Sequence, residues 1–119
     1  MGTREEQQLE GARRQSLFRH VNERIEAITL AAPGSVGEIL CECANLQCAE
    51  PIEMALDEYE KVRLVPTHFF VKPGHVVPDI ERVVEENGRY VVVEKFGEAG
   101  KGAVRLDPRR QSADDPAVA

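Results

Sequence analysis

All three cysteines of the chain lie within one short segment, as Cys41, Cys43 and Cys48. A thiol cluster this tight, in a chain without an apparent export signal, is more typical of a divalent metal site than of a disulfide framework. The odd number of cysteines favours the same interpretation, because pairing two of them would leave one thiol over. We therefore predict that a bound metal ion, zinc in the first instance, constrains how this chain folds.

A closed tetrahedral zinc site needs a fourth ligand, and three histidines compete for that position. His75 is our first choice, because a Pro-Gly pair precedes it and a proline follows it, a pattern that describes a sharp turn. His68 lies in a β-like run, and His20 would require the first helix to cross the metal. The predicted ligands of one structural Zn²⁺ per chain are Cys41, Cys43, Cys48 and His75.

The local pattern around the cysteines is compatible with a shared ion. Residues 38–43 read as an extended run, and alternation along a strand places Cys41 and Cys43 on one side, about 6 to 7 Å apart. Asn45 is a turn residue that could return the chain to Cys48. The Cys-x-Cys-x4-Cys spacing departs from the commoner Cys-x2-Cys knuckle, so three reduced thiols without a metal remain the alternative. The pattern does not separate zinc from ferrous iron.

Length limits how much core the chain can bury. Of its 119 residues, we expect 1–8 to form a flexible N-terminus and 97–119 a disordered, Gly/Pro-rich tail. A single domain over residues 9–96 remains, and burial of apolar surface alone gives a domain of roughly 85 residues little stability against unfolding. Structural zinc contributes on the order of 10 kcal/mol in small metal-dependent peptides, so a metal would matter here.

Residues 3–30 are rich in good helix formers and contain no proline, which predicts a long helix. Its apolar positions Phe18, Val21, Ile25 and Ile28 form one narrow stripe. We expect this stripe to cover a face of the sheet, and the alternative is a helix that binds a partner or dimerises.

The remaining elements are short. We predict strands at 51–54 and 68–72, and a helix at 56–63 with Tyr59 in the core. Asn87-Gly88 between two Val-rich runs predicts a hairpin of 80–86 with 89–95, although 80–86 also suits a two-turn helix. The predicted fold class is α+β: an N-terminal amphipathic helix and one short helix packed on a small, mainly antiparallel sheet with a metal-bound loop.

Several blocks of sequence, in the same order, resemble a family of small actinobacterial proteins with no assigned activity. The family typically has a glycine after the second cysteine and a Thr or Ser that opens the short helix, where this chain has Ala44 and Ala55. The resemblance supports the same four ligands and implies nothing about substrates. The matching blocks are Phe18-Arg19-His20-Val21-Asn22-Glu23-Arg24-Ile25, Cys41-Glu42-Cys43 with Cys48, Glu58-Tyr59-Glu60-Lys61-Val62-Arg63, Phe70-Val71-Lys72-Pro73-Gly74-His75 and Val91-Val92-Val93-Glu94-Lys95.

Charge and motifs limit the function classes. With 21 acidic and 15 basic residues, interleaved to a net charge of −6, the chain lacks the concentrated basic face of a nonspecific nucleic-acid binder. No apolar run is long enough to span a membrane, and the expected compartment is the cytoplasm. No nucleophile elbow, phosphate-binding loop or dinucleotide fingerprint is present. Glu42 and Glu50 near the cysteines could act as bases, but neighbours of this kind are expected by chance in a chain with 30% charged residues.

The function we expect is that of a small, non-catalytic, zinc-stabilised binding or regulatory module. A protein partner would bind through the first helix, at Phe18, Val21, Ile25 and Ile28, or through the sheet edge. One alternative is a thiol and zinc redox sensor, in which oxidation releases the ion. Another is a small metal-dependent hydrolase, which requires an open position on the zinc for water.

Overall fold

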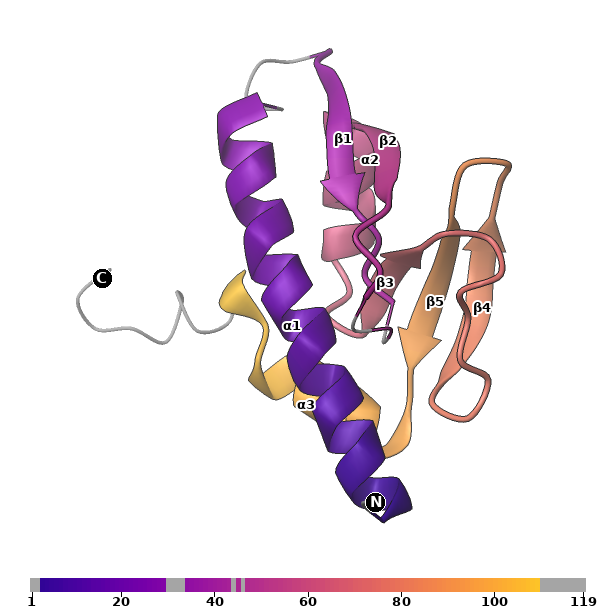
Figure 1. Cartoon of the computed structure of the whole chain (residues 1–119). Helices are drawn as coiled ribbons and strands as arrows, with labels where there is room; N and C mark the ends of the chain where they lie inside the picture. Colours follow the sequence, from indigo (N-terminus) through magenta and orange to yellow (C-terminus); the bar gives the residue numbers. More distant parts are fainter. Residues whose placement is uncertain (1–2, 30–33, 44, 46, 110–119) are drawn as a thin grey trace, which may run out of the picture.

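The structure, a computed structural model, describes residues 3–29, 34–43, 45 and 47–109 of the chain. Within these ranges it has an α+β fold with helices packed beside two small antiparallel sheets (Figure 1). The elements in chain order are α1 (Arg4–Thr29), β1 (Val36–Leu40), β2 (Pro51–Ala55), α2 (Leu56–Arg63), β3 (His68–Val71), β4 (Glu81–Glu86), β5 (Val91–Lys95) and α3 (Gly97–Arg105).

The strands form two sheets where we expected one. β1 pairs with β2, while the second sheet has the order β3-β5-β4, with a bulge in β4 between Val83 and Glu85. The two sheets meet at the segment that follows β1, because Cys41 N donates to Glu50 O at 2.8 Å and Glu42 N donates to Phe70 O at 2.7 Å. The expected extended run of 38–43 therefore ends as a regular strand at Leu40 and continues as a bridge between the sheets.

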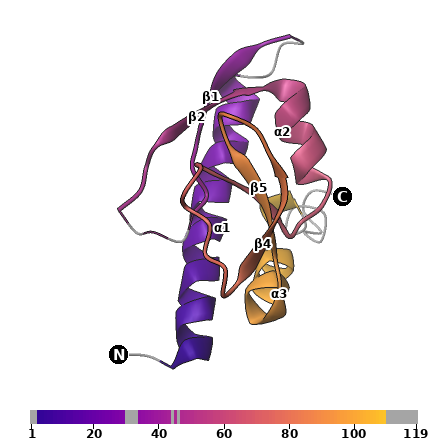
Figure 2. The ribbon, with the colours of Figure 1, turned by 90° about the vertical axis from the view of Figure 1, so that its right-hand side faces the viewer.

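The hairpin prediction for β4 and β5 is confirmed, and the alternative of a helix at 80–86 is wrong. Asn87 closes the turn, since its N–H donates to Tyr90 O at 3.0 Å and its side chain accepts from Arg89 N and Tyr90 N. In Figure 2 this hairpin lies in front of α1, with α2 and α3 toward opposite ends of the molecule.

Helix α1 has the predicted extent but buries only part of the predicted face. Gln15, Arg19 and Asn22 are buried, while Val21 and Ile28 have exposed fractions of 36% and 73%. The expectation that the apolar stripe covers the sheet is thus wrong for Val21 and Ile28, whereas Ile25 is partly buried and packs against the hydrophobic core. The surface beneath α1 presents a buried carboxylate and backbone groups, which require hydrogen-bond donors rather than aliphatic side chains.

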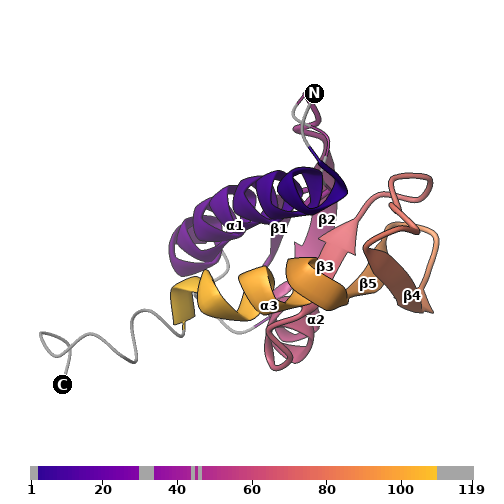
Figure 3. The ribbon, with the colours of Figure 1, turned by 90° about the horizontal axis from the view of Figure 1, so that it is seen from below.

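Residues 97–105 form helix α3, so the prediction of a disordered tail from Gly97 onward is wrong for this part. The glycines that suggested disorder instead allow close packing. A Cβ at Gly100 would lie 2.8 Å from Lys95 O, and Gly102 is buried. Figure 3 shows α3 beside α1, where Ser16 Oγ donates to Leu106 O at 2.9 Å. The rest of the predicted tail, 110–119, lies outside the described residues.

The N-terminal prediction also needs correction, because α1 already begins at Arg4, within the segment that we expected to be flexible. Helix α2 and strand β2 begin where we predicted, and Tyr59 is fully buried as expected. Its ring stacks on Phe70 at a centroid distance of 5.7 Å, and Phe70 meets Tyr90 edge-on at 5.5 Å. The contact between Tyr59 and Phe70 joins α2 to the three-stranded sheet.

Candidate metal centre

The structure brings together all four predicted ligand residues, Cys41, Cys43, Cys48 and His75. Their ligand atoms lie within 4.8 Å of one another. The other two histidines lie elsewhere: His68 Nε2 pairs with Glu94 Oε2 at 3.2 Å, and His20 is exposed on α1. Within the part of the chain that the structure describes, no other group of three or more Cys, His, Asp or Glu side chains converges in this way.

The distances within the cluster suit a tetrahedral ion. His75 Nδ1 lies 3.5 Å from Cys41 Sγ and 3.6 Å from Cys48 Sγ. With zinc bonds of about 2.3 Å to sulfur and about 2.05 Å to nitrogen, tetrahedral angles place a sulfur and a nitrogen about 3.6 Å apart. Cys41, Cys48 and His75 therefore need little rearrangement to share one ion.

A tight turn between β3 and β4 positions His75. Its N–H donates to Lys72 O at 3.0 Å, and Gly74 has a φ of 88°. Proline at the second position and a positive φ at the third are the signature of a type II turn. The same turn places Lys72 N 3.2 Å from Cys41 Sγ, so a backbone donor supports one of the sulfurs. The turn that we inferred from Pro73-Gly74 thus aims the imidazole at the cysteines.

Asn45 organises the loop that carries the cysteines, as the sequence suggested. Its side-chain oxygen accepts from Gln47 N at 2.9 Å, and its carbonyl accepts from Cys48 N at 3.1 Å. Asparagine forms such local turns readily because its side chain can replace a backbone acceptor. These bonds hold the loop that brings Cys48 back to the cluster.

The three thiols are buried, with exposed fractions of 0% for Cys41, 1% for Cys43 and 6% for Cys48. Burial, together with the neighbouring sulfurs, raises the pKa of Cys41 well above its usual range, and burial also raises the pKa of Cys43. Three thiolates cannot share so small and dry a space without a compensating cation. Binding of a divalent metal here would therefore release protons as the thiolates form.

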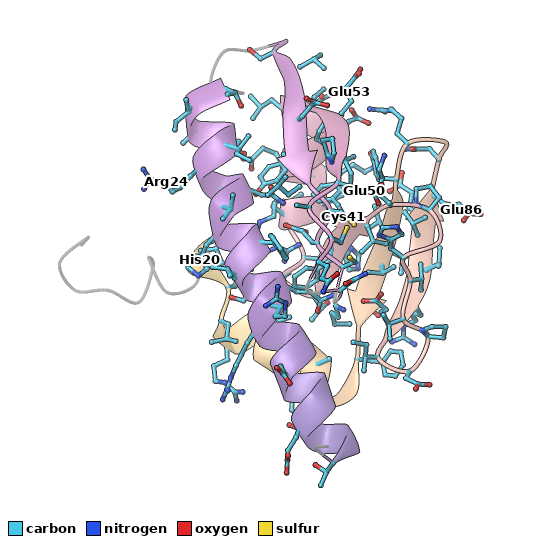
Figure 4. The ribbon with its side chains drawn as sticks, viewed as in Figure 1. His20, Arg24, Cys41, Glu50, Glu53 and Glu86 are labelled. Carbon is cyan, nitrogen blue, oxygen red and sulfur yellow. The ribbon has the colours of Figure 1, made fainter. Side chains whose placement is uncertain are left out.

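Glu50 supports His75 from the solvent side. Glu50 Oε2 lies 3.1 Å from His75 Nε2, and the Glu50 side chain is 55% exposed. A carboxylate on one ring nitrogen of a histidine leaves the other nitrogen free to bind metal, which is a common arrangement around zinc. Figure 4 shows Cys41 and Glu50 close to each other on the strand side of α1. From the sequence we expected Glu50 only as a potential base; its position two residues after Cys48 is the signal that could have indicated a supporting role.

Glu42, the other carboxylate considered as a base, does not face the cluster. It is fully buried, and its oxygens accept hydrogen bonds from Arg19, Asn22 and the backbone of Phe70. A carboxylate saturated with donors in this way cannot serve as a general base toward a water on the metal.

Comparison with known protein families, with curated proteins and with solved structures finds no match to this chain. The resemblance to a family of actinobacterial proteins therefore remains a prediction. Within the described ranges, no helix has both the length and the apolar character needed to cross a bilayer.

Proposed function

We propose that this chain is a small non-catalytic module whose fold is stabilised by one zinc ion on Cys41, Cys43, Cys48 and His75. The observation that carries this proposal is the convergence of three buried sulfurs and one imidazole nitrogen within 4.8 Å. Sulfur and nitrogen ligands in this number are typical of closed structural zinc sites.

The donor set favours a structural role over hydrolysis. Three cysteines and one histidine complete the four-coordinate shell, so no position remains for a water molecule. Three thiolates also donate enough negative charge to weaken the ion as a Lewis acid. Burial of the thiols likewise argues against rapid oxidation, because redox-sensing cysteines are solvent-accessible.

The outer face of α1 is the surface that we propose for a protein partner. Leu17, Val21 and Ile28 have exposed fractions of 56%, 36% and 73%, although a helix in a small domain normally turns such residues inward. His20 and Arg24 project from the same helix, away from the strands (Figure 4). Leu17 lies outside the predicted stripe, and the remaining predicted members are half-buried: Phe18, and Ile25, which packs against the hydrophobic core.

The β4 edge, one of the sheet edges that form our alternative surface, is less favoured. β4 carries exposed Val83 and Val84, but the bulge between Val83 and Glu85 and the charged neighbours interrupt a flat edge. Bulges and charges on an edge strand disfavour pairing with a further strand. Helix-in-groove recognition through α1 is thus the mode of binding that we propose.

The metal assignment is tested by metal content per chain, measured on protein purified without chelator. We expect one tightly held zinc, which Cys48→Ser and His75→Ala lose or hold at least tenfold more weakly, with a lower melting temperature in both. His68→Ala is the matched control, because this histidine lies outside the cluster, and we expect it to keep the zinc. A metal indifferent to His75 would overturn the ligand set.

The partner surface is tested separately by Val21→Asp and Ile28→Asp. Both positions are exposed on α1, so we expect zinc content unchanged and the free energy of unfolding altered by about 0.5 kcal/mol or less. A partner captured by the wild-type chain and by Glu53→Gln should be lost from both α1 variants. Retention of that partner by the α1 variants would contradict the proposed surface.

A further inference from the structure

We propose that Glu42 is a positioning residue of the metal centre, and that through it metal binding and docking of helix α1 strengthen each other. This inference rests on the proposed zinc site and adds a second function for the segment that carries two of its ligands. The residues involved lie on α1, on β3 and in the bridge between the two sheets.

Glu42 stands between the two ligands Cys41 and Cys43 in the sequence, and its carboxylate lies in a different environment from theirs. Oε1 accepts from Phe70 N at 3.1 Å and from Arg19 Nη2 at 3.3 Å, while Oε2 accepts from Asn22 Nδ2 at 3.0 Å. Adjacent side chains of an extended segment point to opposite sides, so the sulfurs can face the ion while the carboxylate faces α1. One short segment therefore contacts the metal on one side and the helix on the other.

Asn22 holds the backbone of the same segment. Its Oδ1 accepts from Leu40 N at 2.8 Å, and its Nδ2 donates to Leu40 O at 2.9 Å as well as to Glu42. The side-chain amide thus makes the two hydrogen bonds to Leu40 that the backbone of an adjacent strand would make. These bonds fix the backbone immediately before Cys41.

Arg19 completes the contact from α1. Its Nη1 donates to Pro66 O at 2.9 Å, its Nη2 donates to His68 O, and its guanidinium lies 3.6 Å from the centre of the Phe69 ring. The side chain is 1% exposed, and desolvation by burial lowers its pKa even with Glu42 beside it. The guanidinium therefore depends on Glu42 for charge compensation in the interior.

These contacts couple metal binding to the docking of helix α1. If the segment around Cys41 loosens when the metal leaves, Glu42 moves with it, and Arg19 and Asn22 lose a buried partner. Conversely, a docked α1 fixes residues 40–42 and holds two of the sulfurs ready for the ion. Coupling between two binding events must act equally in both directions, so each should strengthen the other.

The isosteric variant Glu42→Gln isolates this role. Both carboxylate oxygens receive only donors, so either orientation of a glutamine amide places its NH₂ against an N–H of Asn22, Arg19 or Phe70. The side-chain volume is unchanged, and no predicted metal ligand is removed.

The experiment measures zinc affinity by competition with a chelator, and amide hydrogen exchange of α1 in the zinc-loaded and metal-free full chain. We expect Glu42→Gln to bind zinc 10- to 100-fold more weakly, as is usual for residues that orient metal ligands. In the wild-type chain we expect exchange in α1 to become at least tenfold faster when zinc is removed. Glu53→Gln, an exposed carboxylate on β2, should match the wild type in both measurements.

Val62→Ala serves as the control for general destabilisation, because Val62 is buried and makes no polar contact with Glu42. If this variant lowers the affinity for zinc as much as Glu42→Gln does, the positioning role is overturned.

Should Glu42→Gln fail to fold, Asn22→Ala keeps the carboxylate and carries the same test, with an expected tenfold loss of zinc affinity. Zinc binding by Glu42→Gln or Asn22→Ala within twofold of the wild type would overturn the coupling and leave the zinc site standing. A wild-type chain that binds no zinc would overturn both.

Discussion

At the scale of single residues, the two carboxylates nearest to the cysteines in the sequence have different surroundings. Glu42 is fully buried and bonded to α1, whereas Glu50 is half exposed and pairs with His75. The sequence predicted all four residues that converge but not these supporting contacts, because hydrogen bonds between distant segments leave no pattern in local spacing. His75 was predictable for a local reason: a proline and a glycine define its turn.

Glu50 should tune zinc affinity through His75. We expect Glu50→Ala to bind zinc about tenfold more weakly, because the imidazole loses the carboxylate that orients it. Glu50→Gln should fall between this variant and the wild type, since an amide oxygen accepts the same hydrogen bond without the charge. Competition with a chelator measures both, with Glu53→Gln as the exposed control. Equal affinities across the series would show that His75 is held by its turn alone.

At the scale of elements, sequence periodicity located α1, α2 and the β4–β5 hairpin, since each has a helical or hairpin pattern of its own. It misassigned part of the buried face of α1, because Arg19 and Asn22 are buried to donate hydrogen bonds to Glu42 and to backbone carbonyls that lie far away in the chain. It also missed α3, whose Gly100 packs against Lys95 of β5, because the glycines of this segment suggest disorder by composition. Both errors arise where tertiary contacts override local propensity.

The turn between β3 and β4 provides a prediction about backbone strain. Gly74 has a φ of 88°, and an added Cβ would meet no atom of the described residues within 4 Å, its chain neighbours aside, so Gly74→Ala adds strain without a steric clash. We expect it to lower the free energy of unfolding of the zinc-loaded chain by roughly 1 kcal/mol. Gly88→Ala is the matched control, because Gly88 has equal space but no positive φ. Urea denaturation distinguishes the two, and equal midpoints would contradict the strain in this turn.

At the scale of the whole molecule, the proposed metal lies where the two sheets meet. The cysteine loop follows β1, the His75 turn follows β3, and α1 contacts the bridge between them. The core of aliphatic and aromatic side chains is small, so its burial alone gives a low free energy of unfolding. A metal ion bound by segments of both sheets would raise it. The α+β class was predictable from the sequence, whereas the meeting of two sheets beside the cysteines depends on hydrogen bonds between segments that are far apart in the chain.

The most direct measurement is zinc K-edge X-ray absorption on the zinc-loaded chain, with His75→Ala alongside. We predict three sulfur ligands at about 2.3 Å and one nitrogen at about 2.0 to 2.1 Å, with the nitrogen replaced or the metal lost in the variant. Two results would contradict a closed Cys3His centre: an oxygen ligand of zinc in the wild-type chain, or a spectrum of His75→Ala identical to that of the wild type.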